Sequence, residues 1–129
     1  PGAVQLKLQD LMWEHAGPFR SGEGLERAAV AIRDLREQLP DLTISEDHVF
    51  NLDVQDYYEL KAMLRSAEAV VVSALQRVES RGAHQRLDAP QMSPAFERNQ
   101  LVFLDGSTGP KTPLRSRWRS VVRSEVRSA

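Results

Sequence analysis

Residues 53–81 decide the fold of this chain, with the sequence DVQDYYELKAMLRSAEAVVVSALQRVESR. Their apolar side chains recur three and four positions apart, at Leu60, Met63, Leu64, Ala67, Val71, Ala74, Leu75 and Val78. This spacing is typical of one face of an α-helix. We therefore predict a helix from about Asp53 to Arg81, roughly 40 Å long at ~1.5 Å per residue. Gly82 is expected to end it, because glycine adopts the left-handed conformation without strain.

Two shorter helices are predicted before this one. The first runs from about Val4 to His15 and stops at Gly17-Pro18. The second has Ser21 as its N-cap, ends at Pro40, and carries apolar residues alternately three and four positions apart, at Leu25, Ala28, Ile32, Leu35 and Leu39. Such a seam is typical of helices that pack side by side at a shallow angle. We predict a mainly α fold in which residues 1–90 form an up-down-up (spectrin-repeat-like) three-helix bundle.

The pattern changes in residues 91–129, which we predict to be an irregular C-terminal extension with a short β segment and a basic tail. Leu101–Leu104 is the strand candidate, and the turn signal Asp105-Gly106 follows it. Residues 115–129 are expected to be either a weak helix or disordered. From Pro110 onward the chain has six basic residues and one acidic residue. This +5 tail leaves −6 for residues 1–109, since the whole chain carries −1.

The composition argues against several classes of protein. The 129 residues include no cysteine, so disulfides and thiolate-bound metals or iron–sulfur clusters are excluded. There is no long apolar run for a membrane span and no secretion signal, and we expect a cytoplasmic location. No phosphate-binding glycine loop or HExxH motif occurs, and the near-zero net charge does not favour nucleic acid. We therefore predict no catalytic, cofactor-binding or metal-binding residue in this chain.

The run from Glu79 to Arg86 carries more charge than a helix end requires. It could be an ordinary salt-bridged helix terminus with solvated charges. Direct catalysis is disfavoured, because a single histidine without a nucleophile or an orienting group makes no mechanism. We predict instead that Glu79, Arg81, His84 and Arg86 dock against another domain. Arg81 and Arg86 would pair with carboxylates or carbonyls there, and His84 would bond a buried polar group.

Four large apolar side chains near the helix ends need an assignment. We predict that Met12, Trp13, Phe19 and Met63 lie in the core rather than against a cofactor. The chain also begins with Pro1 instead of methionine, which leads us to expect a piece of a longer protein or the remnant of a processed tag.

Four segments in order carry a resemblance to a known family. Glu79–His84 (ESRGAH) resembles the signature of the C-terminal helical domain in the succinate dehydrogenase/fumarate reductase flavoprotein family, which includes L-aspartate oxidase. Leu11–Arg20 resembles the first helix of that domain, and Leu25–Ala28 the second. Asn51 followed by Glu59-Leu60 resembles the start of the third. Together these matches extend over roughly residues 6–88.

The resemblance implies that the parent protein is an FAD-dependent oxidoreductase that serves electron transport and acts on succinate or fumarate. In that family the flavin and the catalytic residues belong to domains that precede the helical one. The helical domain packs against the flavin domain near the ESRGAH element. The resemblance also implies that the parent protein has an iron–sulfur subunit as a partner and lies at the inner face of the membrane. The isolated chain is expected to be inactive.

Two other interpretations remain open from the sequence. One is that the chain is the C-terminal domain of an L-aspartate oxidase, which Met12-Trp13 also resembles. The other is a stand-alone helical interaction module whose basic tail recruits an acidic partner.

Overall fold

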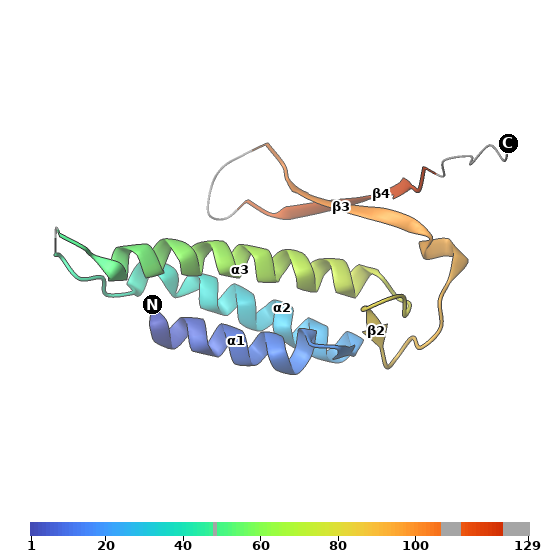
Figure 1. Cartoon of the computed structure of the whole chain (residues 1–129), viewed down its shortest axis with the longest axis horizontal. Helices are drawn as coiled ribbons and strands as arrows, with labels where there is room; N and C mark the ends of the chain where they lie inside the picture. The colour runs from blue at the N-terminus through green and yellow to red at the C-terminus, as the bar shows by residue number, and fades with distance from the viewer. Residues whose placement is uncertain (48, 107–111, 123–129) are drawn as a thin grey trace, which may run out of the picture.

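Three antiparallel helices form the body of the molecule in the computed structural model, which describes residues 1–47, 49–106 and 112–122. They are α1 (Gly2–Ala16), α2 (Gly22–Glu37) and α3 (Leu52–Gln76). Each helix runs opposite to the one before it, and all three lie side by side (Figure 1). The prediction of a mainly α, up-down-up three-helix bundle is confirmed.

The core follows the predicted apolar stripes, except that Val78 lies beyond the end of the third helix and is 50% exposed. From α2 and the short 3₁₀ helix η1 (Leu39–Asp41), every residue of the predicted seam is buried. The buried residues contributed by the other two helices are Val4, Leu8 and Ala16 of α1, and Leu60, Leu64, Ala67, Val71 and Ala74 of α3. Full burial of each leucine or isoleucine contributes about 1.5–3 kcal/mol. The helix interface therefore supplies most of the apolar stabilisation.

The core assignment was wrong for two aromatic residues. Trp13 is 80% exposed and Phe19 is 70% exposed. Trp13 lies seven positions after Leu6, which is also exposed, so both project from the outer face of α1. Since α1 carries apolar residues on two opposite faces, its periodicity does not show which face is the inner one. Met12 and Met63 do pack against the core, as predicted.

Both long helices begin as expected, but α3 ends early. The Ser21 hydroxyl accepts a hydrogen bond from the Gly24 backbone N–H (3.1 Å) and caps α2, as predicted. The last residue of α3 is Gln76, five positions before the predicted end. Gly82 does have a left-handed φ of 57°. It lies in a tight turn beyond the helix, closed by reciprocal backbone hydrogen bonds between Arg81 and His84.

Two small sheets complete the fold. β1 (Phe19–Arg20) pairs in parallel with β2 (Gln85–Arg86), and this joins the α1–α2 connection to the segment after α3. The 3₁₀ helix η2 (Pro94–Phe96) then leads into a hairpin of β3 (Arg98–Leu104) and β4 (Leu114–Ser120), which lies along α3 (Figure 1). The predicted short strand is confirmed and is longer than expected.

Residues 114–120 correct the expectation of a weak helix or disorder for the start of the tail. They form β4, in which Leu114, Ser116 and Trp118 are half-buried while the intervening arginines are exposed. This alternation has a period of two, as in a strand with one covered face. The expectations for residues 123–129 lie outside the described residues.

Candidate docking site

The predicted docking residues all lie in the segment that follows α3, which we call the His84 loop (residues 77–89). The buried Ser80 hydroxyl joins the first part of this loop to its last part. It accepts a hydrogen bond from the Arg86 backbone N–H (2.8 Å) and donates one to the Ala89 carbonyl (2.8 Å). The Leu87 backbone N–H donates to the Arg20 carbonyl (2.8 Å), which fixes the loop to β1.

Glu79 is a fully buried carboxylate inside this loop, with an exposed fraction of 0%. Oε1 accepts hydrogen bonds from Arg77 Nη1 (2.6 Å) and Arg81 Nε (3.0 Å), and Oε2 accepts one from the Ser93 backbone N–H (2.8 Å). Burial by itself would raise the pKa of this carboxyl, but these three donors outweigh it and lower the pKa to about 2. Glu79 is therefore ionised and organises the loop around itself.

Arg86 is also buried and ties the loop to the end of α3. Its Nη1 donates to the carbonyls of Ala74 (3.0 Å) and Leu75 (3.1 Å), where a cation is favoured by the helix dipole. Its Nε and Nη2 donate to the two carboxylate oxygens of Asp88 (2.8 and 2.5 Å), and these bonds lower the pKa of Asp88 to about 2. A side chain at Gly22 would displace this pair, because its Cβ would lie 2.9 Å from Arg86 Nη2 and from Asp88 Oδ2.

His84 bridges two parts of the fold through its ring nitrogens. Nδ1 lies 3.0 Å from Arg20 Nη1, and Nε2 lies 2.8 Å from the Arg77 carbonyl. Because a guanidinium can only donate, Nδ1 must accept, and the ring proton is on Nε2, which donates to the carbonyl. Burial and the positive charges of Arg20, Arg86 and Arg77 lower the pKa of His84, although the bond to the carbonyl raises it. The imidazole is thus a neutral bridge.

The four predicted residues therefore differ in what they leave accessible. Glu79 and Arg86 are buried by partners within the chain, whereas the Arg81 side chain is 37% exposed and His84 is half-buried. A docking role for Glu79, Arg81, His84 and Arg86 stays a prediction. Sequence reasoning did not include Arg20 in this set, because nothing in the spacing relates it to His84, 64 positions later.

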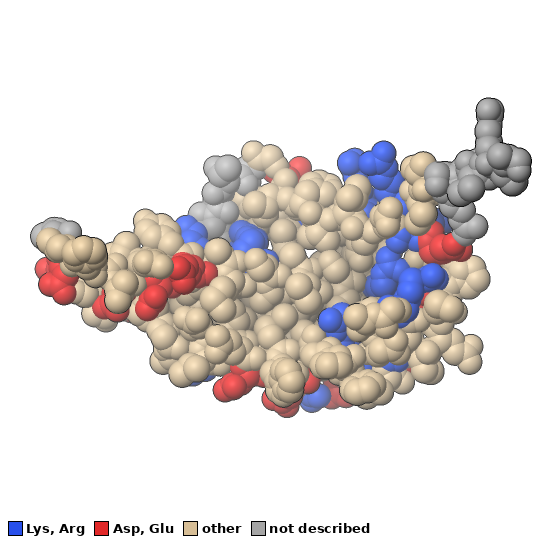
Figure 2. Space-filling model, in the orientation of Figure 1, with Lys and Arg blue, Asp and Glu red and all other residues tan. Residues whose placement is uncertain are grey.

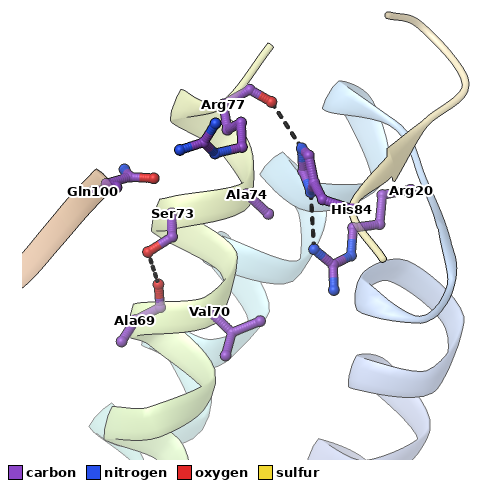
Figure 3. Close-up of a pocket in the computed structure, with 8 residues that line it drawn as sticks. All are labelled: Arg20, Ala69, Val70, Ser73, Ala74, Arg77, His84 and Gln100. Carbon is purple, nitrogen blue, oxygen red and sulfur yellow. Dashed lines mark hydrogen bonds between the residues drawn. The ribbon is translucent and has the colours of Figure 1, made fainter. Parts of the chain in front are cut away.

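An open groove of about 400 Å³ lies beside His84. The groove is lined by side chains of α3, by Arg20 and His84 on one side of this helix, and by Gln100 of β3 on the other (Figure 3). Within the described ranges, no group of three histidine, cysteine or acidic side chains could hold a metal ion. None of the helices described is long and apolar enough to cross a membrane.

Comparison with known sequences places the chain in a family. The family described as "Fumarate reductase flavoprotein C-term" matches residues 5–126, nearly the whole chain. The chain belongs to this family. The flavoprotein resemblance carried by the ESRGAH element is confirmed, and the chain is a C-terminal domain of the fumarate reductase/succinate dehydrogenase flavoprotein type.

Similar proteins of this flavoprotein family are much longer than the chain. The fumarate reductase flavoprotein subunit of Haemophilus influenzae is 33% identical over 110 residues, which are 84% of this chain and 18% of that protein. The fumarate reductase flavoprotein subunit of Mycobacterium tuberculosis is 40% identical over 89 residues, covering 67% of this chain and 15% of the relative.

Solved structures show the same relation. The Sdh1 complex of Mycobacterium smegmatis in the apo form superposes with a TM-score of 0.86 and 26% identity, over 93% of this chain and 20% of the matched chain. A quinol-fumarate reductase with menaquinol molecules gives a TM-score of 0.80 and 29% identity, over 94% of this chain and 22% of the matched chain. The chain thus spans about a fifth of the length of its relatives.

Proposed function

We propose that this chain is the helical domain that docks onto the flavin domain of an FAD-dependent fumarate reductase/succinate dehydrogenase, and that it has no activity alone. The observation that carries the proposal is the family match over residues 5–126 in a chain that covers about a fifth of its relatives. The relatives' names point to succinate and fumarate as the substrates of the parent. The match favours this function over a stand-alone interaction module.

An exposed apolar surface at one end of the bundle suits such docking. Trp13, Phe19 and Leu87, which we call the Trp13 surface, are 80%, 70% and 69% exposed. Phe19 is the first residue of β1, Leu87 directly follows the last residue of β2, and Trp13 lies in the last turns of α1. In this proposal the three side chains form one contact surface, since exposed apolar patches mark interaction sites. In this proposal Glu79 and Arg86 hold the His84 loop in shape, and Arg81 and His84 form the polar edge of the contact.

The flavin itself does not fit the residues described. Dinucleotide sites use parallel strands joined by a helix and a glycine-rich turn. The parallel pairing described here consists of two strands of two residues each. We therefore assign FAD, and every catalytic step, to the rest of the parent protein. In this proposal the parent protein transfers electrons with an iron–sulfur subunit and lies at the cytoplasmic face of the membrane.

Flavin binding and domain release test this function. The purified chain should take up no FAD, whereas the full-length parent should bind FAD and reduce fumarate. In the parent, Trp13→Glu should put a charge into the contact and speed the proteolytic release of this domain. Tyr58→Glu is the matched control, since Tyr58 is 63% exposed at the opposite end of the bundle. FAD uptake by the chain alone, or equal release in both variants, would contradict the proposal.

A further inference from the structure

Arg20 is a half-buried cation without a carboxylate partner in the part of the chain that the structure describes. Its Nε donates to the carbonyls of Ala16 (3.2 Å) and Gly17 (3.0 Å), and its Nη1 donates to His84 Nδ1 (3.0 Å). All three acceptors are neutral. A guanidinium has five N–H groups, so its Nη2 end remains available for another acceptor.

The charges around the His84 loop make this end of the molecule receptive to an anion. Glu79 is shared by Arg77 and Arg81, and Asp88 pairs with Arg86. With Arg20, the hydrogen-bonded network contains four arginines and two carboxylates. Glu97 and Glu26 also act on Arg81 and Arg86 through space, but among the described residues no carboxylate pairs with Arg20. Lysine and arginine side chains gather mainly at this end and over the hairpin, while acidic ones dominate the opposite end (Figure 2). Because Arg20 is partly buried, water screens its charge less than it screens a surface charge.

The groove gives an incoming group access to this guanidinium. Figure 3 shows Arg20 facing α3 across the groove, with one arm bonded to His84 and the other directed away from it. On the facing wall, Val70 and Ala74 of α3 point toward Arg20, while Ala69 and Ser73 lie on the side of the helix nearer Gln100. The groove is open, so it would leave much of a free small acid in water, whereas small-molecule sites enclose most of their ligand. A protein segment lying along the groove would cover it.

We propose that this groove binds an aspartate or glutamate side chain from another segment of the parent flavoprotein, with Arg20 as the cation that pairs with its carboxylate. A carboxylate matches the guanidinium through two parallel N–H···O bonds. His84 positions Arg20, because it holds one arm of the guanidinium and keeps the plane fixed. The inference rests on the proposed function, since the segment belongs to the part of the parent outside this chain.

Carbodiimide cross-linking of the full-length parent tests the proposal. The reagent joins a carboxylate directly to a primary amine that touches it. A guanidinium does not react in this way, so the Arg20→Lys variant is used to place an amine in the groove. We expect the Arg20→Lys parent to gain a cross-linked peptide that the wild type lacks, joining position 20 to an acidic residue outside residues 1–129. Mass spectrometry of the digest would identify that residue.

Arg27→Lys provides the matched control, because Arg27 contacts Glu23 within this chain at 3.0 Å. Its cross-link to Glu23 shows that the reagent reaches the domain. If Arg27→Lys links while Arg20→Lys links to nothing, or only to residues within 1–129, the groove does not bind a carboxylate of the parent. The Trp13→Glu release assay reports on docking separately, so a failed cross-link with a positive release assay overturns this inference alone.

Discussion

Replacing Glu79 with glutamine tests whether the buried carboxylate holds the His84 loop together. Glu79→Gln keeps the shape of the side chain but removes its charge. The amide oxygen can replace one acceptor, and the amide nitrogen would face donors that already surround the site. If the amide oxygen stays with Arg77 and Arg81, these two lose only the negative charge, and the Ser93 backbone N–H loses its acceptor at 2.8 Å to the amide nitrogen.

The magnitude follows from the burial of the two partners. Breaking a buried ion pair by removing one member costs about 3–5 kcal/mol. Here the Arg77 and Arg81 side chains are 17% and 37% exposed, so water can solvate part of the positive charge that loses its partner. We therefore expect the lower end, about 3 kcal/mol, against a total stability of about 5–15 kcal/mol for a domain. At about 3–5 °C per kcal/mol for a chain of this size, the melting temperature should fall by about 10–15 °C.

Thermal unfolding of the purified chain, followed by circular dichroism, measures this loss. Glu23→Gln is the control, because it makes the same substitution in an ion pair whose acid side chain is 77% exposed. It should cost under about 1 kcal/mol. Hydrogen exchange at the Ser93 amide should speed up in Glu79→Gln alone. The reasoning is refuted if the two variants have the same melting temperature and the Ser93 amide stays protected from exchange in both.

Two further predictions concern the same loop. The folded pKa values of Glu79 and Asp88, about 2, lie below their ordinary values of 4.5 and 3.8. Acid therefore favours the unfolded chain, and the melting temperature should fall from about pH 5 down to about pH 2. Glu79→Gln should flatten this decline, and an equally steep one would contradict the assignment. Ser80→Ala should cost about 1–3 kcal/mol in urea unfolding, because the buried Arg86 N–H loses its acceptor, whereas exposed Ser66→Ala should be nearly neutral.

The helices could be predicted from sequence wherever a local pattern determines them. The apolar seam of α2 and its Ser21 cap need only neighbouring residues to be recognised. The end of α3 cannot be recognised from neighbouring residues, since residues 77–81 contain nothing that forbids a helix. The backbone leaves the helix there because Glu79 and Ser80 find partners at Ser93 and Arg86, beyond the reach of any helical period. The strand β4, which contains no valine, was missed because Trp118 and the valines that follow the strand can be placed together on one helical face.

The candidate site could be predicted as a group of residues but not as a geometry. The density of charge drew attention to the segment that holds Glu79 and His84, and its docking role stays a prediction. Sequence alone suggested solvated charges as the ordinary alternative, and burial of Glu79 excludes that for this side chain. The contact of His84 with Arg20 depends on the parallel pairing of β1 with β2, a tertiary feature without a local signal.

The buried ion pairs of the His84 loop are better explained by geometry than by stability. A buried pair gains little net free energy, because desolvation offsets most of the attraction. Glu79 and Arg86, however, each bind partners from several directions, so the loop has a single arrangement that satisfies them. That arrangement sets His84 against Arg20 and holds the guanidinium before any partner arrives. A group ordered in advance loses less entropy on binding. In the docking that we propose, the two buried pairs would therefore support recognition by Arg20 and Arg81 without contacting the partner themselves.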